Sequence, residues 1–251
     1  MKTLLLRFAG PMQSWGFESH FTNRGTADWP TKSGVIGMIA SAMGRSREES
    51  VSDLCKLRMG VRIDRAGYRS TDYHIVRHMK KKGNGTETTQ TMRDYLFDAI
   101  FLVGVCSDDD SLIESVSDAL LHPAHQLYLG RRACAPGMPL VLKTTEKNLL
   151  QALSDEEWQV KVDSMKWEEV NSAYSTSASE ISRRIIIDGS LLKADNNSVI
   201  RDVPVSYSSI HRKYSFRKVE ELYVTIPTGI SGTVHGIHGI AETVQDPMSQ
   251  L

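Results

Sequence analysis

The stretch Tyr95-Leu-Phe-Asp-Ala-Ile-Phe-Leu-Val-Gly-Val105 is the most apolar part of the chain and predicts a central β-strand. The acidic run Asp108–Asp110 follows it and precedes a predicted helix. In that helix Ser111 and Glu114 have the spacing of a capping box, and His122-Pro123 ends it. This strand and this helix are the centre of the predicted fold.

Elements on both sides of this pair complete a familiar order. Thr3–Ala9 is a compact apolar run that predicts a buried strand. Apolar residues recur at helical spacing between positions 33 and 43, and Thr31 or Ser33 can cap this helix. Leu57–Arg65 alternates apolar and basic residues like a half-buried strand, and Pro139–Lys143 adds a short strand. Strand, helix, strand, strand, helix, strand is the ferredoxin-like order.

The chain beyond residue 143 contains further short strand signals around polar turns. These are Lys166–Tyr174, Ile181–Asp188, Val203–Tyr207 and Leu222–Ile226. We therefore expect an α+β protein with a ferredoxin-like domain over residues 1–143 and a smaller, mainly β region over residues 144–251. Gly229–Leu251 is rich in Gly, Thr and His, and we expect it to be a mobile tail in the isolated protein.

Composition excludes several classes of protein. The 251 residues are 40% hydrophobic and 24% charged, which is typical of a globular protein rather than a disordered or membrane-embedded one. The apolar run Leu4–Leu6 is too short for a signal peptide, and no stretch approaches the roughly 20 apolar residues that cross a bilayer. Three widely spaced cysteines without a CxxC motif predict neither disulfides nor a cysteine metal site. We expect a cytoplasmic protein.

Charge is balanced overall but not locally. The 30 Lys and Arg residues equal the 30 Asp and Glu residues, so no global attraction to nucleic acid is predicted. Between Arg58 and Arg93, however, nine basic residues stand against three acidic ones. Such local excess is what a polyanion requires, although a solvated loop explains it equally well.

The same region has the pattern of a projecting hairpin, which we call the thumb (residues 69–93). Two β-compatible arms, Tyr73–Val76 and Thr88–Met92, flank the basic and glycine-containing tip Lys80–Gly85. Tyr, His, Arg, Thr and Gln side chains on these arms can stack on bases or donate hydrogen bonds to RNA.

Two short motifs carry residues suited to phosphate. Lys32-Ser33 opens a helix, but Thr31 stands where a phosphate-binding loop requires glycine, so an ATPase is not predicted. The helix start and Lys32 can still hold one phosphate. Gly130-Arg131-Arg132 places two guanidinium groups beside a flexible residue, which suits phosphate contacts as well as structural salt bridges.

Catalytic and metal motifs are not apparent. The eight histidines are scattered without a nucleophile elbow, and His235–His238 with Glu242 lacks the helical context of a zinc site. We therefore expect neither a metal nor a cofactor. One enzyme hypothesis stays open, a metal-independent endoribonuclease in which His74 acts as the base toward a 2′-hydroxyl. A scaffold that binds only protein is a third possibility.

Five stretches resemble a known family of CRISPR-associated RAMP proteins, the CasD-like subunits of the type I-E Cascade complex. They are Leu5–Gly16, Pro30–Gly37, Asp72–Val76, Glu87–Leu96 and Tyr128–Cys134. The C-terminal part matches only loosely, through Arg201–Pro204 and His211–Tyr214.

This resemblance implies a non-catalytic subunit that binds and caps the 5′ handle of the crRNA in antiviral defence. Its implied partners are the crRNA handle, the Cascade backbone subunit, the Cascade large subunit and, indirectly, target DNA. Lys32, Arg131 and Arg132 would hold handle phosphates, and Tyr73, His74 and Arg93 would order displaced bases. The full set of expected RNA-binding residues is Arg24, Lys32, Ser33, Tyr73, His74, Arg77, Arg93, Tyr128, Arg131 and Arg132.

Overall fold

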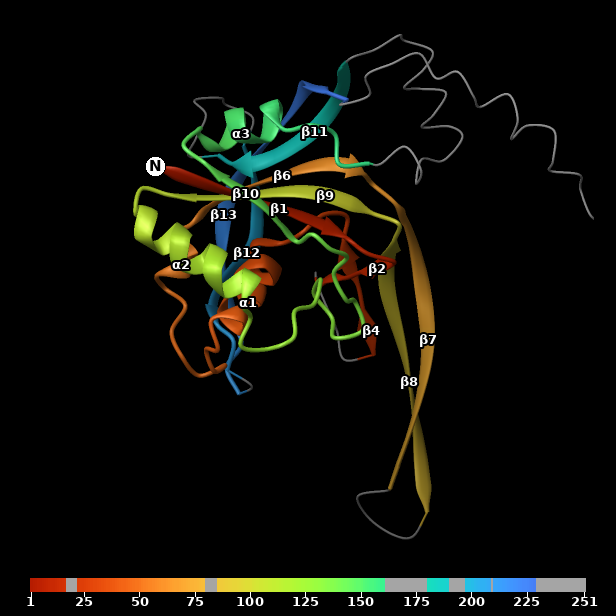
Figure 1. Ribbon diagram of the computed structural model, residues 1–251. Helices are drawn as coiled ribbons and strands as arrows, with labels where there is room; N and C mark the ends of the chain where they lie inside the picture. Colours follow the sequence, from red (N-terminus) through yellow and green to blue (C-terminus); the bar gives the residue numbers. More distant parts are fainter. Residues whose placement is uncertain (17–21, 80–84, 161–179, 190–196, 209, 229–251) are drawn as a thin grey trace, which may run out of the picture.

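The computed structural model describes residues 1–16, 22–79, 85–160, 180–189, 197–208 and 210–228. It is a mixed α/β structure dominated by antiparallel sheet, with a long two-stranded hairpin that extends away from the body (Figure 1). None of the described helices is long and apolar enough to cross a membrane.

A seven-stranded sheet forms the centre of the fold. Its strands are β1 (Lys2–Ala9), β6 (Arg58–Arg65), β9 (Ile100–Ser107), β10 (Val141–Thr145), β11 (Glu180–Asp188), β12 (Asn197–Ser206) and β13 (Lys213–Pro227). They lie in the order β10-β1-β9-β6-β11-β13-β12, and all neighbours are antiparallel. The sequence order β1, α1, β6, β9, α2, β10 agrees with the predicted order of elements.

Helices cover both faces of this sheet. They are α1 (Lys32–Ala42), α2 (Asp110–Leu121), α3 (Leu149–Asp155) and the short 3₁₀ helix η1 (Leu54–Lys56). Leu4, Leu6 and Phe8 of β1 belong to the core shared with α1 and α2, whereas Leu5 packs with α3. Alternate residues of one strand thus serve two separate cores, as the pleat of a sheet requires.

The prediction of one strand over residues 95–105 is wrong. Tyr95 to Phe97 end β8 (Thr86–Phe97), and β9 begins only at Ile100. Asp98 between them adopts a φ of 56°, the left-handed conformation that Asp tolerates better than most residues. Because apolar residues flank this turn on both sides, hydrophobicity alone conceals it.

The predicted cap of α1 is confirmed, whereas the predicted capping box of α2 is wrong. Thr31 caps α1, since its hydroxyl accepts a hydrogen bond from the N–H of Gly34 at 3.3 Å. At α2 the cap is Asp109, whose carboxylate accepts hydrogen bonds from the Ser111 hydroxyl and from the main-chain N–H groups of Ser111 and Leu112. The bond from the Ser111 hydroxyl, followed by those from the main chain, lowers the pKa of Asp109. The predicted capping box is absent there because Glu114 instead forms an ion pair with Lys2.

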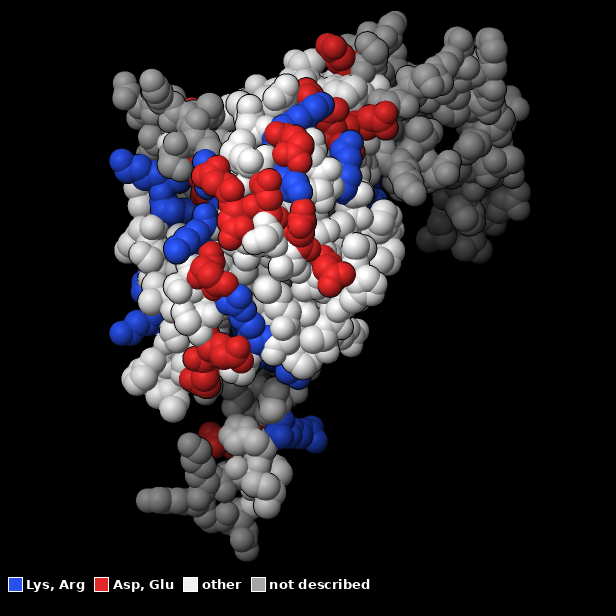
Figure 2. Space-filling model, turned by 60° about the vertical axis from the view of Figure 1, so that its left-hand side comes forward, with Lys and Arg blue, Asp and Glu red and all other residues white. Residues whose placement is uncertain are grey.

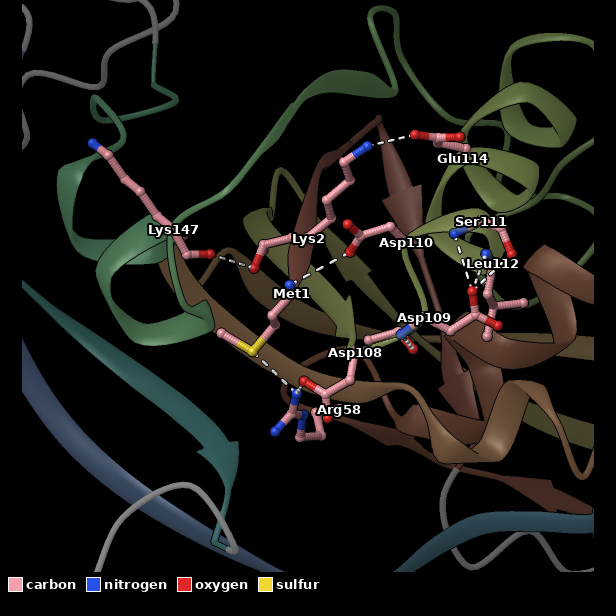
Figure 3. A network of polar contacts seen from close by, with 12 residues as sticks. Met1, Lys2, Arg58, Asp108, Asp109, Asp110, Ser111, Leu112, Glu114 and Lys147 are labelled. Carbon is pink, nitrogen blue, oxygen red and sulfur yellow. Dashed lines mark hydrogen bonds and ion pairs between the residues drawn. The ribbon is translucent and has the colours of Figure 1, made fainter.

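Ion pairs tie the N-terminus, β1 and β6 to the start of α2 (Figure 3). The terminal amine of Met1 lies 3.5 Å from Asp110, Lys2 pairs with Glu114, and Arg58 contacts Asp108 at 2.8 Å. Acidic side chains gather on this side of the molecule among scattered Lys and Arg (Figure 2). This face is therefore unsuited to a polyanion.

The thumb is a long hairpin, as predicted. Its strands β7 (Tyr68–Met79) and β8 pair antiparallel over their whole length, from Tyr68 opposite Phe97 to Met79 opposite Thr86. Every residue of β7 is exposed. At its base β8 also pairs with β2 (Met12–Gln13) and β4 (Asn23–Arg24), whereas β3 (Trp15–Gly16) pairs with β5 (Thr26–Ala27). Most of the predicted tip, residues 80–84, lies outside the described residues.

The strands beyond residue 144 continue the same sheet. β11 pairs with β6, placing Ile186 opposite Val61, and β13 and β12 follow. The predicted strands at 181–188, 203–207 and 222–226 are present, although β12 and β13 begin earlier than predicted. The predicted strand at 166–174 and the tail at 229–251 lie outside the described residues. The division at residue 144 stays a prediction, although sheet pairing crosses it.

A buried cluster of four charged side chains joins these strands to α1. Asp202 of β12 accepts hydrogen bonds from the main-chain N–H of Lys32 at 2.8 Å and from the guanidinium of Arg217 at 2.7 Å. Asp188 of β11 accepts from Arg217 and from the ammonium of Lys32 at 3.2 Å. Burial lowers the pKa of Arg217, but its bonds to these two carboxylates raise it overall.

Two glycines of the central sheet make room for α3. An added Cβ at Gly104 would lie 2.5 Å from Cδ1 of Leu149, and one at Gly60 would lie 2.7 Å from Cδ1 of Leu153. We expect Gly104→Ala to lower the free energy of unfolding by about 1–3 kcal/mol, because the inserted methyl group overpacks the core. Urea denaturation measures this. Gly16→Ala is the control, since nothing lies within 4 Å of its added Cβ, and an equal loss there would contradict the packing argument.

We expect Asp202→Ala to cost about 3–5 kcal/mol of stability, because it leaves the Arg217 charge and a helix N–H buried without this partner. Thermal or urea unfolding of the variant checks the value. Glu114→Ala removes a carboxylate that is largely exposed, and there we expect a loss below about 1 kcal/mol. Similar losses in both variants would show that burial does not set the cost.

Candidate nucleic-acid interface

Two adjoining hollows of about 620 and 750 Å³ form a groove beside the start of α1. Its walls come from α1 and the segment after it, the loop before residue 133, and the connection between β12 and β13. Six residues line both hollows: Ser33, Gly34, Gly130, Tyr207, Arg212 and Tyr214. Segments distant in sequence therefore meet at one place.

Arginine dominates the charge of this groove. The lining contains Arg24, Arg45, Arg47, Arg131, Arg132 and Arg212. None of its described residues is Asp or Glu. We call this hollow the arginine groove. Guanidinium groups bind phosphate oxygens through paired N–H donors, so the groove suits a phosphate-bearing polymer.

These arginines differ in what already binds them. Arg45 donates to both carboxylate oxygens of Asp53, and these bonds lower the pKa of Asp53 to about 2. The side chains of Arg24, Arg47, Arg132 and Arg212, by contrast, form no hydrogen bond or ion pair within the described part of the chain. All four of these side chains are exposed. They are the cations that an incoming phosphate meets first.

Arg131 instead supports the groove from within. Its guanidinium donates to the carbonyls of Asp94 at 3.0 Å and of Arg24 at 2.5 Å, and lies 4.8 Å from the centre of the Tyr95 ring. Gly130 before it has a φ of 89°, and an added Cβ would lie 1.7 Å from the Ser14 carbonyl oxygen. Gly130 allows the close approach to Ser14, and the hydrogen bonds of Arg131 to neighbouring carbonyls hold the loop in place.

The start of α1 forms the opposite side. The hydroxyl of Tyr207 donates to the carbonyl of Ser33, and burial raises the pKa of this tyrosine. Lys32 does not line the groove. Its side chain is only 6% exposed and its ammonium faces Asp188 in the buried cluster. The expected phosphate contact by Lys32 does not fit this position, because the ammonium points into the protein.

The structure brings together about half of the expected RNA-binding residues. Arg24, Ser33, Tyr128, Arg131 and Arg132 all line the arginine groove. Of the other expected residues, Lys32 lies in the buried cluster and the rest lie on the thumb.

On the thumb, Tyr73, His74 and Arg77 are exposed on β7, beyond the base of the hairpin. Arg93 of β8 pairs in register with Arg24 of β4, at the point where the thumb joins the groove. Its buried Nε atom has no partner among the described residues.

Sequence reasoning missed Tyr207, Arg212, Arg45 and Arg47. The stretch His211–Tyr214 resembles the family only loosely, and its basic composition is the one signal that points to Arg212. Nothing in the local pattern around Arg45 or Arg47 separates them from ordinary surface arginines. In the described ranges no group of three His, Cys, Asp or Glu side chains could hold a metal ion.

Comparisons with known proteins agree on one family. The family described as CRISPR-associated protein (Cas_Cas5) matches residues 3–220. The chain is 34% identical to the Cascade subunit CasD of Escherichia coli (strain K12) over 161 residues, covering 57% of this chain and 71% of that protein.

Solved structures give the same result. A chain of a CRISPR RNA-guided surveillance complex superposes with a TM-score of 0.74 and 31% identity, covering 94% of this chain and 96% of that one. The crystal structure of a Cas protein gives a TM-score of 0.64 and 32% identity over 90% and 98% of the two chains. The chain therefore belongs to the Cas5 family of CRISPR-associated proteins and is similar to CasD.

Proposed function

We propose that this chain is a non-catalytic subunit of a Cascade surveillance complex that binds and caps the 5′ handle of the crRNA. The relative in Escherichia coli is named as a Cascade subunit, and a similar chain belongs to an RNA-guided surveillance complex. On this proposal residues 1–143 are a ferredoxin-like RAMP domain with an inserted thumb, followed by the β region at 144–251. The protein works in the cytoplasm.

The arginine groove is the observation that carries this proposal. Four of its arginines, Arg24, Arg47, Arg132 and Arg212, face solvent without a carboxylate partner among the described residues. Two tyrosines, Tyr128 and Tyr214, line the same groove and offer aromatic surface to bases. Cations and aromatic rings together in one hollow suit a single RNA strand with splayed bases better than a duplex.

The exposed side chains of the thumb are evidence for a protein partner. Strand pleating and the pairing of Tyr73 with Met92 place Tyr73, Ile75, Met79 and Met92 on one face, and all four are about half exposed or more. Apolar side chains exposed together on one face favour a protein contact, and Arg77, which shares this face, is compatible with one because arginine is enriched in protein interfaces. We assign this contact to the Cascade backbone subunit. The large subunit is the second protein partner, and target DNA is reached only through the assembled complex.

The endoribonuclease alternative has less support. Catalysis by His74 requires a second group that gives or takes a proton, and no carboxylate among the described residues contacts its ring. The nearest comparable pair on the thumb, His78 and Glu87, lies at 3.7 Å on an exposed surface. We therefore assign no catalytic role to the thumb.

Gel electrophoresis tests the proposal. One 5′-labelled CRISPR repeat RNA is incubated with the protein in EDTA and run on native and denaturing gels. We expect a shifted band with intact RNA, and the shift should weaken steeply as salt rises, because phosphate contacts release counterions. A discrete cleavage product that disappears in His74→Ala would establish the nuclease instead. Neither a shift nor a product would leave the protein-only scaffold.

The two neighbouring arginines of the groove should behave differently. We expect Arg132→Ala to weaken RNA binding and to lower the salt slope of log K by about 0.7, with an unchanged melting temperature, since Arg132 has no partner within the described residues. Arg131→Ala should weaken binding and also lower the melting temperature, because three carbonyls lose their donor.

Fluorescence anisotropy across a salt series and thermal melting measure the two effects. Lys147→Ala is the matched control. It removes a cation at the start of α3, which packs on the other face of the sheet from α1, and it should leave RNA binding unchanged. An equal loss of affinity in this variant would mean that net charge, rather than the groove, binds the RNA.

A further inference from the structure

The outer face of β12 and β13 carries exposed apolar side chains beside cations. Phe216 is 63% exposed and Val199 is 62% exposed, although both lie within strands. Val199 pairs with Lys218, and strand alternation puts Lys218 and Phe216 on the same face. We call Val199, Arg201, Phe216 and Lys218 the strand platform.

The cations on the two faces of β13 differ in whether a carboxylate pairs with them. On the inner face Arg217 is neutralised by Asp188 and Asp202 in the buried cluster. On the outer face neither Arg201 nor Lys218 has an ion pair with any described carboxylate. Their charges are therefore available to a ligand.

Arg201 and Phe216 form a unit. The guanidinium carbon of Arg201 lies 5.9 Å from the centre of the Phe216 ring, and its Nε donates to the carbonyl of Tyr214 at 3.5 Å. The arginine is thus held beside the ring, while most of the ring stays open to solvent. An exposed aromatic ring on a strand with a cation next to it is the arrangement on which single-stranded bases stack.

The strand platform continues the arginine groove. Arg212 and Tyr214 line the groove, and Phe216 and Lys218 follow on the same strand at intervals of two residues, about 7 Å each. A strand of RNA that leaves the groove past Tyr214 therefore meets Phe216 and Arg201 next. The platform shares the face of β13 that packs Leu222 and Val224 against α3, so an RNA strand passes from the α1 side of the sheet to this face at Tyr214. No acidic residue lies between Tyr214 and Lys218 in the sequence.

We propose that the strand platform is a second binding surface for the same RNA strand, where nucleotides next to those in the arginine groove stack on Phe216 and place phosphates on Arg201 and Lys218. This inference rests on the proposed RNA-binding function and extends it. A protein partner fits the patch less well, because the centres of protein interfaces are depleted in lysine.

The test compares affinities for a nested set of 5′-labelled CRISPR repeat RNAs, shortened one nucleotide at a time from either end. We expect Phe216→Ala to match the wild-type protein for the shortest RNAs and to bind the longer ones roughly five-fold or more weakly, because stacking is lost. Phe216→Tyr keeps the ring and should bind like the wild type. Thermal melting of both variants checks that the fold is intact.

Each other outcome separates this inference from the function on which it rests. Failure of the wild-type protein to bind any RNA overturns both. Equal affinities of Phe216→Ala and wild type at all lengths, with Arg132→Ala weakened at all lengths, overturn the strand platform and leave the groove. Unchanged RNA binding by Phe216→Ala, combined with loss of assembly with the other Cascade subunits, identifies the patch as a protein contact and also overturns the inference.

Discussion

The buried pairing of Asp202 with Arg217 and with the first N–H of α1 is the contact on which the groove depends. It connects strands near the end of the described chain to a helix near its start, about 170 positions earlier. Two carboxylates and two cations neutralise one another there, so the cluster as a whole carries no net charge. The cluster, together with the hydrogen bond from the Tyr207 hydroxyl to the Ser33 carbonyl, fixes the connection that carries Tyr207 and Arg212 relative to α1.

This arrangement explains why some cations of the protein are buried and structural whereas others are exposed in the groove. Lys32 and Arg217 use their charge inside the protein, where it orients α1 and β13. Arg24, Arg132 and Arg212 keep their charge at the surface of the groove. Arg131 is intermediate, because it lines the groove while its guanidinium holds three carbonyls of neighbouring loops. The architecture therefore separates cations that build the site from cations that remain free to bind.

Sequence patterns predicted the order of strands and helices and the thumb, because amphipathic periodicity and glycine-rich turns are local signals. They missed the turn at Asp98, which interrupts an otherwise continuous apolar run. They also missed α3, whose seven residues provide too few turns for a clear helical period. Lys32 shows the deeper limit. Its position at a helix start was predicted correctly, but Asp188, which turns its side chain inward, is 156 residues away. A local sequence pattern cannot predict the direction of a side chain that is set by a partner so distant in the sequence.

The exposed apolar stripe of the thumb has a consequence for the protein before it assembles. A two-stranded hairpin that shields neither face has little to stabilise it on its own, and Tyr73, Ile75, Met79 and Met92 stay in contact with water until something covers them. A chain synthesised in excess over its partners therefore displays a surface that favours self-association and recognition by chaperones and proteases. We therefore expect the free chain to be removed faster than a chain whose thumb is covered.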